Sequence, residues 1–378
     1  MTDRSDTGDP DGAILSRPAR RRFLRTLLNV GFGAGVASAL TPGQLLSDEA
    51  TIVYGLAWRG RSEPERLRTD VPRAWYEGLR RSFDVQSLVV DANFPGIVGT
   101  FVVPGTYDDP APRLDVDVTP ALRSLSDLED LLADVEYTIE FVQPSDPELS
   151  PGSIDEERGH RVGLTGTRVP AGALCTDGEK EGTLAPALDA NGRQFFVTSN
   201  HIYGAEGTLE TEHRGEPLYL RHREGTTRIG TVVQGFPEED IVLAEPDDPY
   251  SPASTIATPL PTQAVGHFTM AGLADLYARG ESLEKVGAIS GHTSGEIKGI
   301  NGVTCYYGGL CRRGQLKWGS KETMTDGDSG SISYHPDPER PGQVLVGGVN
   351  NARTWWPGGD FTWGAGAHHI YDRHGYHF

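Results

Sequence analysis

The sequence predicts a mainly β protein, in which a small α+β domain precedes a larger region of short strands. Residues 50–142 read as strand, helix, two strands, helix and strand. From about residue 161, short apolar runs are separated by turns rich in glycine and proline. Many short strands in succession favour a β-sandwich or β-barrels. With 378 residues, 37% of them hydrophobic, the chain can fill the cores of two or three domains.

The first 47 residues have the layout of an export signal. Arginines at 20–22 precede Phe23 and Leu24, an apolar and glycine-rich stretch covers residues 26–40, and small residues occupy 37–39. This order is typical of secretory signals, and the paired arginines resemble a twin-arginine signal. An uncleaved membrane anchor is the alternative, although the apolar stretch is short for a spanning helix. No later segment is apolar for long enough to span a membrane. We therefore expect an extracellular or cell-surface protein.

Residues 48–143 form the expected α+β domain. Strands are predicted at 51–58, 96–103, 113–118 and 137–142, and helices at 71–83 and 121–135. This β-α-β-β-α-β order is that of a ferredoxin-like domain. No convincing catalytic cluster lies in it. Residues 144–160 are rich in Pro, Ser, Asp and Glu and are expected to be a linker, so that residues 161–378 form the β-rich domain.

The charge of the chain is strongly acidic. The net charge is -19, and the only lysines are Lys180, Lys285, Lys298, Lys317 and Lys321. An acidic, lysine-poor surface stays soluble where salt screens charge, so the composition suits a halophilic source; an ordinary acidic secreted protein is the alternative. Such a surface repels nucleic acid and anionic membranes, and no nucleic-acid partner is expected.

The three cysteines are too few for a disulfide framework. Five residues, including Gly308 and Gly309, separate Cys305 from Cys311 and allow a bridged, hairpin-sized loop, but spacing alone leaves the pairing open. Cys175 is then a small buried residue. No zinc spacing is present, and the histidines at 368, 369, 374 and 377 read as a polar chain end. Neither a metal nor a cofactor is expected.

The strongest local signal for chemistry is the stretch TDGDSGS at residues 325–331, in which Ser329 occupies a glycine-bracketed turn before an apolar strand. Such a turn exposes the hydroxyl group. Glycine at 327 can adopt positive φ, so that the N–H groups of Gly327 and Ser329 converge on one point as an oxyanion hole requires. Serine is a weak nucleophile by itself, so a base and an orienting acid must come from elsewhere in the chain.

His201 and Asp240 are the candidates for base and acid. His201 follows an apolar strand and a short turn, and Asp240 directly precedes the apolar run at 241–244. The order His, Asp, Ser is one of three in which unrelated folds build this triad, and it is the chymotrypsin order. An α/β-hydrolase is excluded, because its nucleophile motif has glycine at the position of Ser331.

The segments TSNH at 198–201, DIVL at 240–243 and GDSGS at 327–331 together resemble the three signatures of trypsin-like serine peptidases. The stretch KVGAISGHTSG at 285–295 resembles a glycine-rich segment of the streptogrisin-like bacterial and archaeal branch. The resemblance covers residues 161–378. It implies a chymotrypsin-like double β-barrel and a monomeric serine endopeptidase, with polypeptide substrates and with His201, Asp240 and Ser329 as catalytic residues. The rival hypothesis is an inactive barrel that serves as a surface binding or scaffolding module, and the intact triad argues against it.

The resemblance also assigns residues around the triad. Thr323 falls near the base of the specificity pocket and residues 349–352 fall at its wall; these are Val349, Asn350, Asn351 and Ala352. None is charged, so the preferred substrate side chain stays unnamed. Ile202 replaces a cysteine of the animal relatives, so the fold must hold without that bridge. In the streptogrisin-like branch an internal cation neutralises the acid beside the nucleophile, which implies an ion pair between Lys285 and Asp328. Residues 48–143 resemble the pro-domains of such enzymes.

Overall fold

The computed structural model describes residues 48–143, 166–204, 213–222, 225–258, 262–306, 310–337, 339–354 and 359–378. The expected export signal and the expected linker at 144–160 lie outside the described residues. From Glu49 to Phe378 the chain forms one compact unit. None of the helices in the described ranges is long and apolar enough to cross a membrane.

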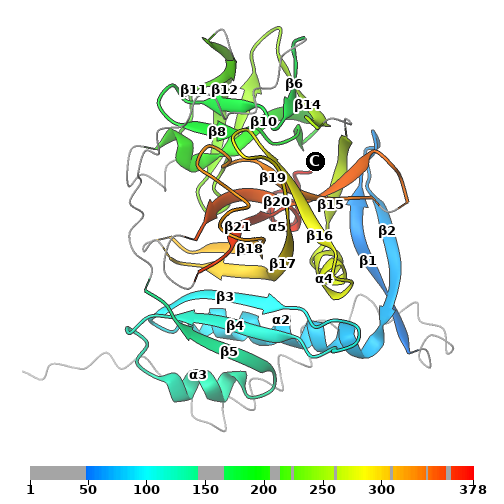
Figure 1. Ribbon diagram of the computed structural model, residues 1–378, viewed down its shortest axis with the longest axis vertical. Coiled ribbons are helices and arrows are strands. Elements are labelled where there is room, and N and C mark those ends of the chain that lie inside the picture. Colours follow the sequence, from blue (N-terminus) through cyan, green and yellow to red (C-terminus); the bar gives the residue numbers. More distant parts are fainter. Residues whose placement is uncertain are drawn as a thin grey trace, which may run out of the picture. The chain divides into compact units, whose positions relative to one another are not determined.

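Six antiparallel strands close into a β-barrel, which lies in the centre of Figure 1. In order around the barrel they are β16 (Ser282–Gly287), β17 (Gly291–Thr304), β18 (Arg312–Trp318), β21 (Thr362–Gly366), β20 (Gln343–Arg353) and β19 (Ile332–Pro336), which pairs back with β16. Register shifts interrupt β17 and β20. Such irregularities bend a strand and so help a sheet to close.

Seven further strands form a second, open sheet that curves into a half-barrel. Their order is β8 (Glu181–Thr183), β7 (Leu174–Thr176), β11 (Pro217–His222), β12 (Gly225–Phe236), β13 (Ile241–Pro246), β10 (Arg193–Ser199) and β9 (Leu188–Ala190). One apolar cluster joins both sheets, because Val197 and Leu243 of the half-barrel pack in the same core as Tyr334 and Val346 of the barrel. The protein is therefore mainly β with a chymotrypsin-like double β-barrel, as expected.

The N-terminal part consists of β1 (Glu49–Ala57), β2 (Glu65–Pro72), α2 (Arg73–Ala92), β3 (Ile97–Val103), β4 (Arg113–Val118), α3 (Leu125–Leu132) and β5 (Glu136–Phe141). Helix α2 buries Trp75, Leu79 and Val89 in one core, at the spacing of one helical face. That core also contains Ile300 of β17 and Trp318 of β18. The N-terminal part and the barrel therefore share their interior.

The expected ferredoxin-like arrangement is not found. β1 pairs with β2 and with β15 (Thr262–Phe268), not with β3, β4 or β5, and β3 pairs with β17 of the barrel, as both views show. Strand β2 was not predicted, because its sequence ERLRTDVP has few apolar residues. The order of elements along the chain does not specify partners two hundred residues away, and these partners decide the topology here.

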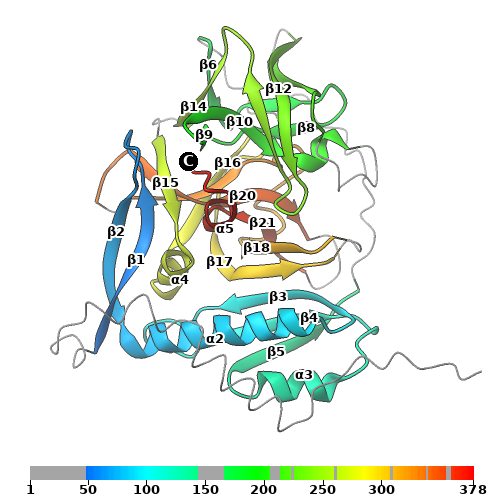
Figure 2. The same ribbon diagram turned by 180° about the vertical axis from the view of Figure 1, so that it is seen from behind.

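The remaining elements are β6 (Arg168–Ala171), η1 (Asn200–Tyr203), β14 (Ser251–Ile256), α4 (Met270–Ala278) and α5 (Ala367–His374). The expectation of a polar chain end is wrong, because residues 367–374 form helix α5, which buries part of its side chains. Its Ile370 lies in the core that joins both sheets, and His368 is buried. Beyond α5, His377 stacks on Trp58 with ring centroids 3.9 Å apart. Figure 2 shows α5 beside β20 and β21 of the barrel.

Candidate active site

His201 and Asp240 form a hydrogen-bonded pair at the end of the half-barrel. His201 lies in η1 directly after β10, and Asp240 directly precedes β13, which pairs with β10. The carboxylate Oδ2 is 2.7 Å from His201 Nδ1, and Oδ1 accepts the backbone N–H of His201 at 2.9 Å. Asp240 is buried, whereas 27% of the His201 side chain is exposed. The pair therefore presents its imidazole to solvent and keeps its carboxylate inside.

Asp240 is held in a left-handed backbone conformation with φ 55°. This conformation is uncommon for a residue other than glycine, and such residues are frequent at functional sites. Its carbonyl oxygen accepts hydrogen bonds from Asn200 N at 3.0 Å and from Asn351 Nδ2 at 2.9 Å, which hold the strained residue in place.

The charge of Asp240 is stabilised by its neighbours. Arg312 Nη2 lies 3.5 Å from Asp240 Oδ2. Burial alone would raise the pKa of Asp240, but His201 and Arg312, together with the hydrogen bonds from His201, outweigh burial and lower that pKa. The carboxylate is thus ionised at neutral pH and can orient an imidazole.

Ser329 lies in the turn before β19, and Asn351 links it to Asp240. Its Oγ donates to the carbonyl of Asn351 at 3.3 Å, and the side chain of Asn351 donates to the carbonyl of Asp240. Gly330, at φ 93°, packs the turn against β10: a Cβ on it would lie 2.4 Å from Thr198 Oγ1. The structure thus brings the serine turn to the strand end that carries His201. A direct contact between Ser329 and His201 stays a prediction.

The backbone N–H groups of the serine turn differ in whether they are hydrogen-bonded. Gly327 has φ 88°, as predicted for this glycine. The N–H groups of Asp328, Gly330 and Ser331 donate to carbonyls within the protein. By contrast, those of Gly327 and Ser329 have no hydrogen-bond acceptor among the described residues. These two amides are the pair that the sequence assigns to an oxyanion hole.

The structure also brings Lys285 and Asp328 together, in the interior behind the turn. Lys285 Nζ is 2.9 Å from Asp328 Oδ2, and both side chains are fully buried. The carboxylate also accepts the N–H groups of Ile289, Ser290 and Thr325 at 3.0–3.1 Å. Burial lowers the pKa of Lys285, and the charge of Asp328 opposes that effect. The ion pair joins β16 to the serine turn.

The residues predicted to line the specificity pocket are mostly engaged in structural contacts. Thr323 is buried, and its Oγ1 accepts Ser320 N at 2.8 Å. Val349 lies in the core, and the side chain of Asn350 accepts Trp318 Nε1 at 3.0 Å. The side-chain amide of Asn351 donates a hydrogen bond to the carbonyl of Asp240. Ala352 is partly buried beside Trp363 and Phe361, so it has the most exposed position of the set.

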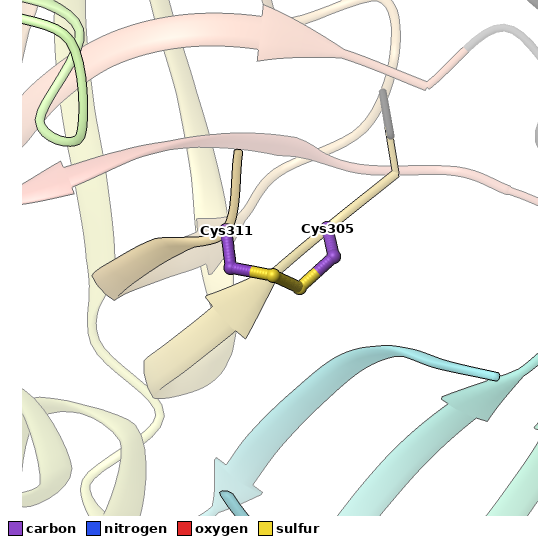
Figure 3. The surroundings of a disulfide bond; sticks show 2 residues. All are labelled: Cys305 and Cys311. Carbon is purple, nitrogen blue, oxygen red and sulfur yellow. A yellow bond between two sulfur atoms is a disulfide. The ribbon is translucent and has the colours of Figure 1, made fainter. Parts of the chain in front are cut away.

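Cys305 and Cys311 form a disulfide bond that links the end of β17 to the start of β18 (Figure 3). The bond settles the pairing that spacing left open. Cys175 is a buried free thiol, and burial raises its pKa to about 12. Among the described residues, no group of three His, Cys, Asp or Glu side chains is arranged to hold a metal ion.

Sequence reasoning missed two contacts of residues 237–240, the loop that ends at Asp240. Arg312, which follows the disulfide, reaches Asp240, and its Nε donates to Pro237 O at 3.5 Å. The buried carboxylate of Glu239 lies 3.1 Å from both Arg373 and His374 of α5. Neither contact is predictable from motifs, although the acidic residue next to Asp240 is visible in the sequence.

Comparisons with known proteins give only distant similarities. No family model matches the chain, and no curated protein sequence matches it. Among solved structures, a glutamic acid specific serine protease that uses a histidine triad in substrate binding shares 17% identity over 55% of this chain and 99% of its own, with a TM-score of 0.40. Protease A of Thermobifida fusca shares 16% identity over 55% of this chain and 97% of its own, with a TM-score of 0.39.

The chymotrypsin of Cellulomonas bogoriensis is similar to the same extent, with 19% identity over 55% of this chain and 97% of its own and a TM-score of 0.39. These neighbours are serine proteases. At such identities and TM-scores they carry no argument about the site, which rests on the contacts described above.

Proposed function

We propose that the protein is a serine endopeptidase that hydrolyses peptide bonds through an acyl-enzyme. The observation that supports it best is the pairing of a buried, ionised Asp240 with His201 at 2.7 Å, beside a serine turn that offers two neighbouring amides. A carboxylate that fixes the imidazole leaves its second nitrogen available as a base, which is what a serine nucleophile needs.

In the proposed reaction, the Ser329 hydroxyl turns from the carbonyl of Asn351 towards His201. Its oxygen forms a bond to the substrate carbonyl carbon while His201 takes the hydroxyl proton. The carbonyl oxygen becomes an oxyanion, which the amides of Gly327 and Ser329 stabilise. His201 then gives its proton to the leaving amine, the peptide bond breaks, and water releases the acyl group by the same steps. No cofactor takes part.

The proposal is tested by labelling the purified protein with a phosphonate probe for active-site serines, in high salt, for wild type and Ser329→Ala. We expect wild type to be labelled and the variant not to be. Hydrolysis of a casein substrate should fall about 10⁴-fold or more in the variant, as happens when a nucleophile is removed from an intact triad. A wild-type protein that neither reacts nor cleaves, although folded, would favour the inactive binding or scaffolding module.

We further propose that the protein is exported to the cell surface or medium of a halophilic cell as a monomer acting on polypeptides. The twin-arginine-like start of the chain and the disulfide bond support export, and the acidic, lysine-poor composition supports a halophilic source. Fusing residues 1–47 to a reporter and measuring its export, with Arg20–Arg22 replaced by lysine as the control, tests the signal.

A further inference from the structure

Thr183 connects the two sheets at the serine turn. It is the last residue of β8 in the half-barrel, is fully buried, and is not part of any motif in the sequence. The turn that carries Ser329 precedes β19 of the closed barrel. Contacts made by Thr183 therefore tie the nucleophile to the sheet that carries His201 and Asp240.

Both backbone polar groups of Thr183 are used at this junction. Its N–H donates to the carbonyl of Ser329 at 2.7 Å. Its carbonyl accepts the hydroxyl of Thr198 at 2.9 Å, three residues before His201. The fit is close, because a Cβ on Gly330 would lie 2.3 Å from the carbonyl oxygen of Thr183. Only glycine fits at 330 against this strand.

The side chain of Thr183 makes a second bridge. Its Oγ1 donates to the carbonyl of Gly327 at 2.8 Å and accepts the N–H of Ala288 at 3.0 Å. Ala288 lies in the segment whose next two amides hold the carboxylate of Asp328. One hydroxyl thus joins the serine turn to the loop that buries the ion pair of Lys285 and Asp328.

These bonds fix the peptide groups around the two free amides. The carbonyls of Gly327 and Ser329 accept from Thr183 Oγ1 and N, and the carbonyl of Asp328 accepts from Ser331 N at 2.9 Å. The carbonyl and the N–H of one planar peptide group belong to successive residues. The amide of Ser329 therefore shares its plane with the carbonyl of Asp328, and Thr183 anchors the peptide groups on either side of that plane. Glycine at 327 has little conformational preference of its own. An external anchor is therefore needed to keep the turn in one conformation.

We propose that Thr183 is a positioning residue for the oxyanion hole: its hydroxyl holds the peptide group of Gly327 and Asp328, which lies between the two peptide groups that carry the amides of Gly327 and Ser329, so that these amides stay aimed at one point. This inference rests on the proposed peptidase function. Loss of the hydroxyl should weaken stabilisation of the oxyanion without removing the nucleophile, the base or the substrate site.

The test compares Thr183→Val, which keeps the shape of the side chain and removes the hydroxyl, with Thr183→Ser, which keeps the hydroxyl. We expect Thr183→Val to lower kcat about 10- to 100-fold at nearly unchanged KM, less than the loss of an oxyanion donor itself. It should also lower the affinity for a peptide aldehyde by a similar factor, because the aldehyde forms a tetrahedral adduct with the serine and places its oxygen in the oxyanion hole. Thr183→Ser should restore kcat to within about 3-fold of wild type, since the hydrogen bond is retained.

Thr176→Val is the matched control. Thr176 is a buried threonine of the neighbouring strand β7, and its Oγ1 accepts Gly178 N at 2.9 Å, away from the serine turn. This variant should lose stability but keep kcat and aldehyde affinity. If Thr183→Val does not fold, Thr183→Ala removes the same hydroxyl with less crowding and is measured instead.

The proposal is overturned if the variant without the hydroxyl keeps wild-type kcat and aldehyde affinity, or if Thr183→Ser is as impaired as Thr183→Val. Labelling of Ser329 separates this failure from failure of the proposed function. A wild-type protein that is not labelled rules out both proposals, whereas a labelled and active wild type with an unaffected Thr183→Val rules out only the positioning role.

Discussion

At the scale of single residues, the buried contact between Lys285 and Asp328 determines how the serine turn is held. Replacing Lys285 by Met leaves the carboxylate of Asp328 buried with only backbone donors. We expect Lys285→Met to lower the free energy of unfolding by about 3 to 5 kcal/mol, because breaking a buried pair leaves one charge uncompensated. Peptidase activity should fall with it, since the turn loses its anchor. Urea unfolding and a peptidase assay measure both effects.

Lys298→Met is the control for Lys285, because Lys298 is a partly exposed lysine 3.5 Å from the exposed carboxylate of Asp360. It should change stability by less than about 1 kcal/mol. The double variant Lys285→Met with Asp328→Asn removes both charges and should be more stable than Lys285→Met alone. Full activity in Lys285→Met would show that the ion pair does not support the site.

Individual site residues differed in how far the sequence predicted them. The positions of Gly327 and Lys285 follow from local motifs, since a turn glycine and a rare lysine in an apolar segment are visible in the sequence. Asn351 was predicted to line a pocket, but its amide binds the carbonyl of Asp240. Thr183 and Arg312 gave no signal, because their contacts are made across sheets by residues of ordinary type.

At the scale of elements, the disulfide bond fixes the start of β18, where Arg312 turns towards Asp240. Replacing Cys305 and Cys311 by Ser opens a short loop and should lower the free energy of unfolding by about 2 kcal/mol. If the proposed function holds, it should also reduce activity, because Arg312 then loses part of its restraint beside Asp240. Cys175→Ala, which removes a thiol but no bridge, is the control. A double variant with wild-type stability and activity would contradict the coupling.

Local periodicity predicted several elements well. The expected strands at 96–103, 113–118 and 137–142 agree with β3, β4 and β5 within one residue at each end. Periodicity did not indicate α5, whose sequence AHHIYDRH has few apolar residues and gains its stability by packing on the barrel. Pairing partners were the least predictable feature, since register and neighbours depend on contacts between distant segments.

At the scale of the whole molecule, residues 49–143 and the barrel are joined by strand pairing and a common core. Besides the pairing of β3 with β17, Gln86 Nε2 donates to Asn301 O at 2.9 Å, and the hydroxyl of Tyr306 donates to Asp117. We expect that cutting a protease site engineered into residues 144–165, after folding, leaves the two pieces bound to each other. They should elute together from a gel-filtration column in high salt.

The same shared core predicts that a gene lacking residues 49–143 yields unfolded or insoluble protein, because Ile300 and Trp318 would lose their packing partners. An active barrel produced alone, or pieces that separate after the cut, would instead support a removable pro-domain that folds by itself. Cutting an engineered site at residues 205–212 is the control for damage caused by the protease, since the strands on either side of this segment, β10 and β11, belong to the half-barrel.

The stability of the whole molecule should also depend on two buried histidines. Burial, with smaller effects of His368 and His377, lowers the pKa of His267 to about 3, and burial and His369 lower that of His368 to about 3. In the unfolded chain both have pKa values near 6.5. Below pH 6.5 the unfolded state therefore binds protons that the folded state does not. The free energy of unfolding therefore has the full contribution of the two neutral histidines above pH 6.5, and it loses this contribution as the pH drops towards 3.

Each of these histidines should cost about 1.4 kcal/mol of stability per pH unit in that window, so the pair together gives about 2.7 kcal/mol per unit. Neither ring nitrogen of His368 has a hydrogen-bond partner among the described residues, so His368→Leu should fold and show about half of the wild-type slope. His292→Gln, at an exposed histidine, is the control for the removal of a histidine as such. Urea unfolding between pH 7 and pH 4.5 measures the slopes, and equal slopes in wild type and His368→Leu would show that His368 is not the group responsible.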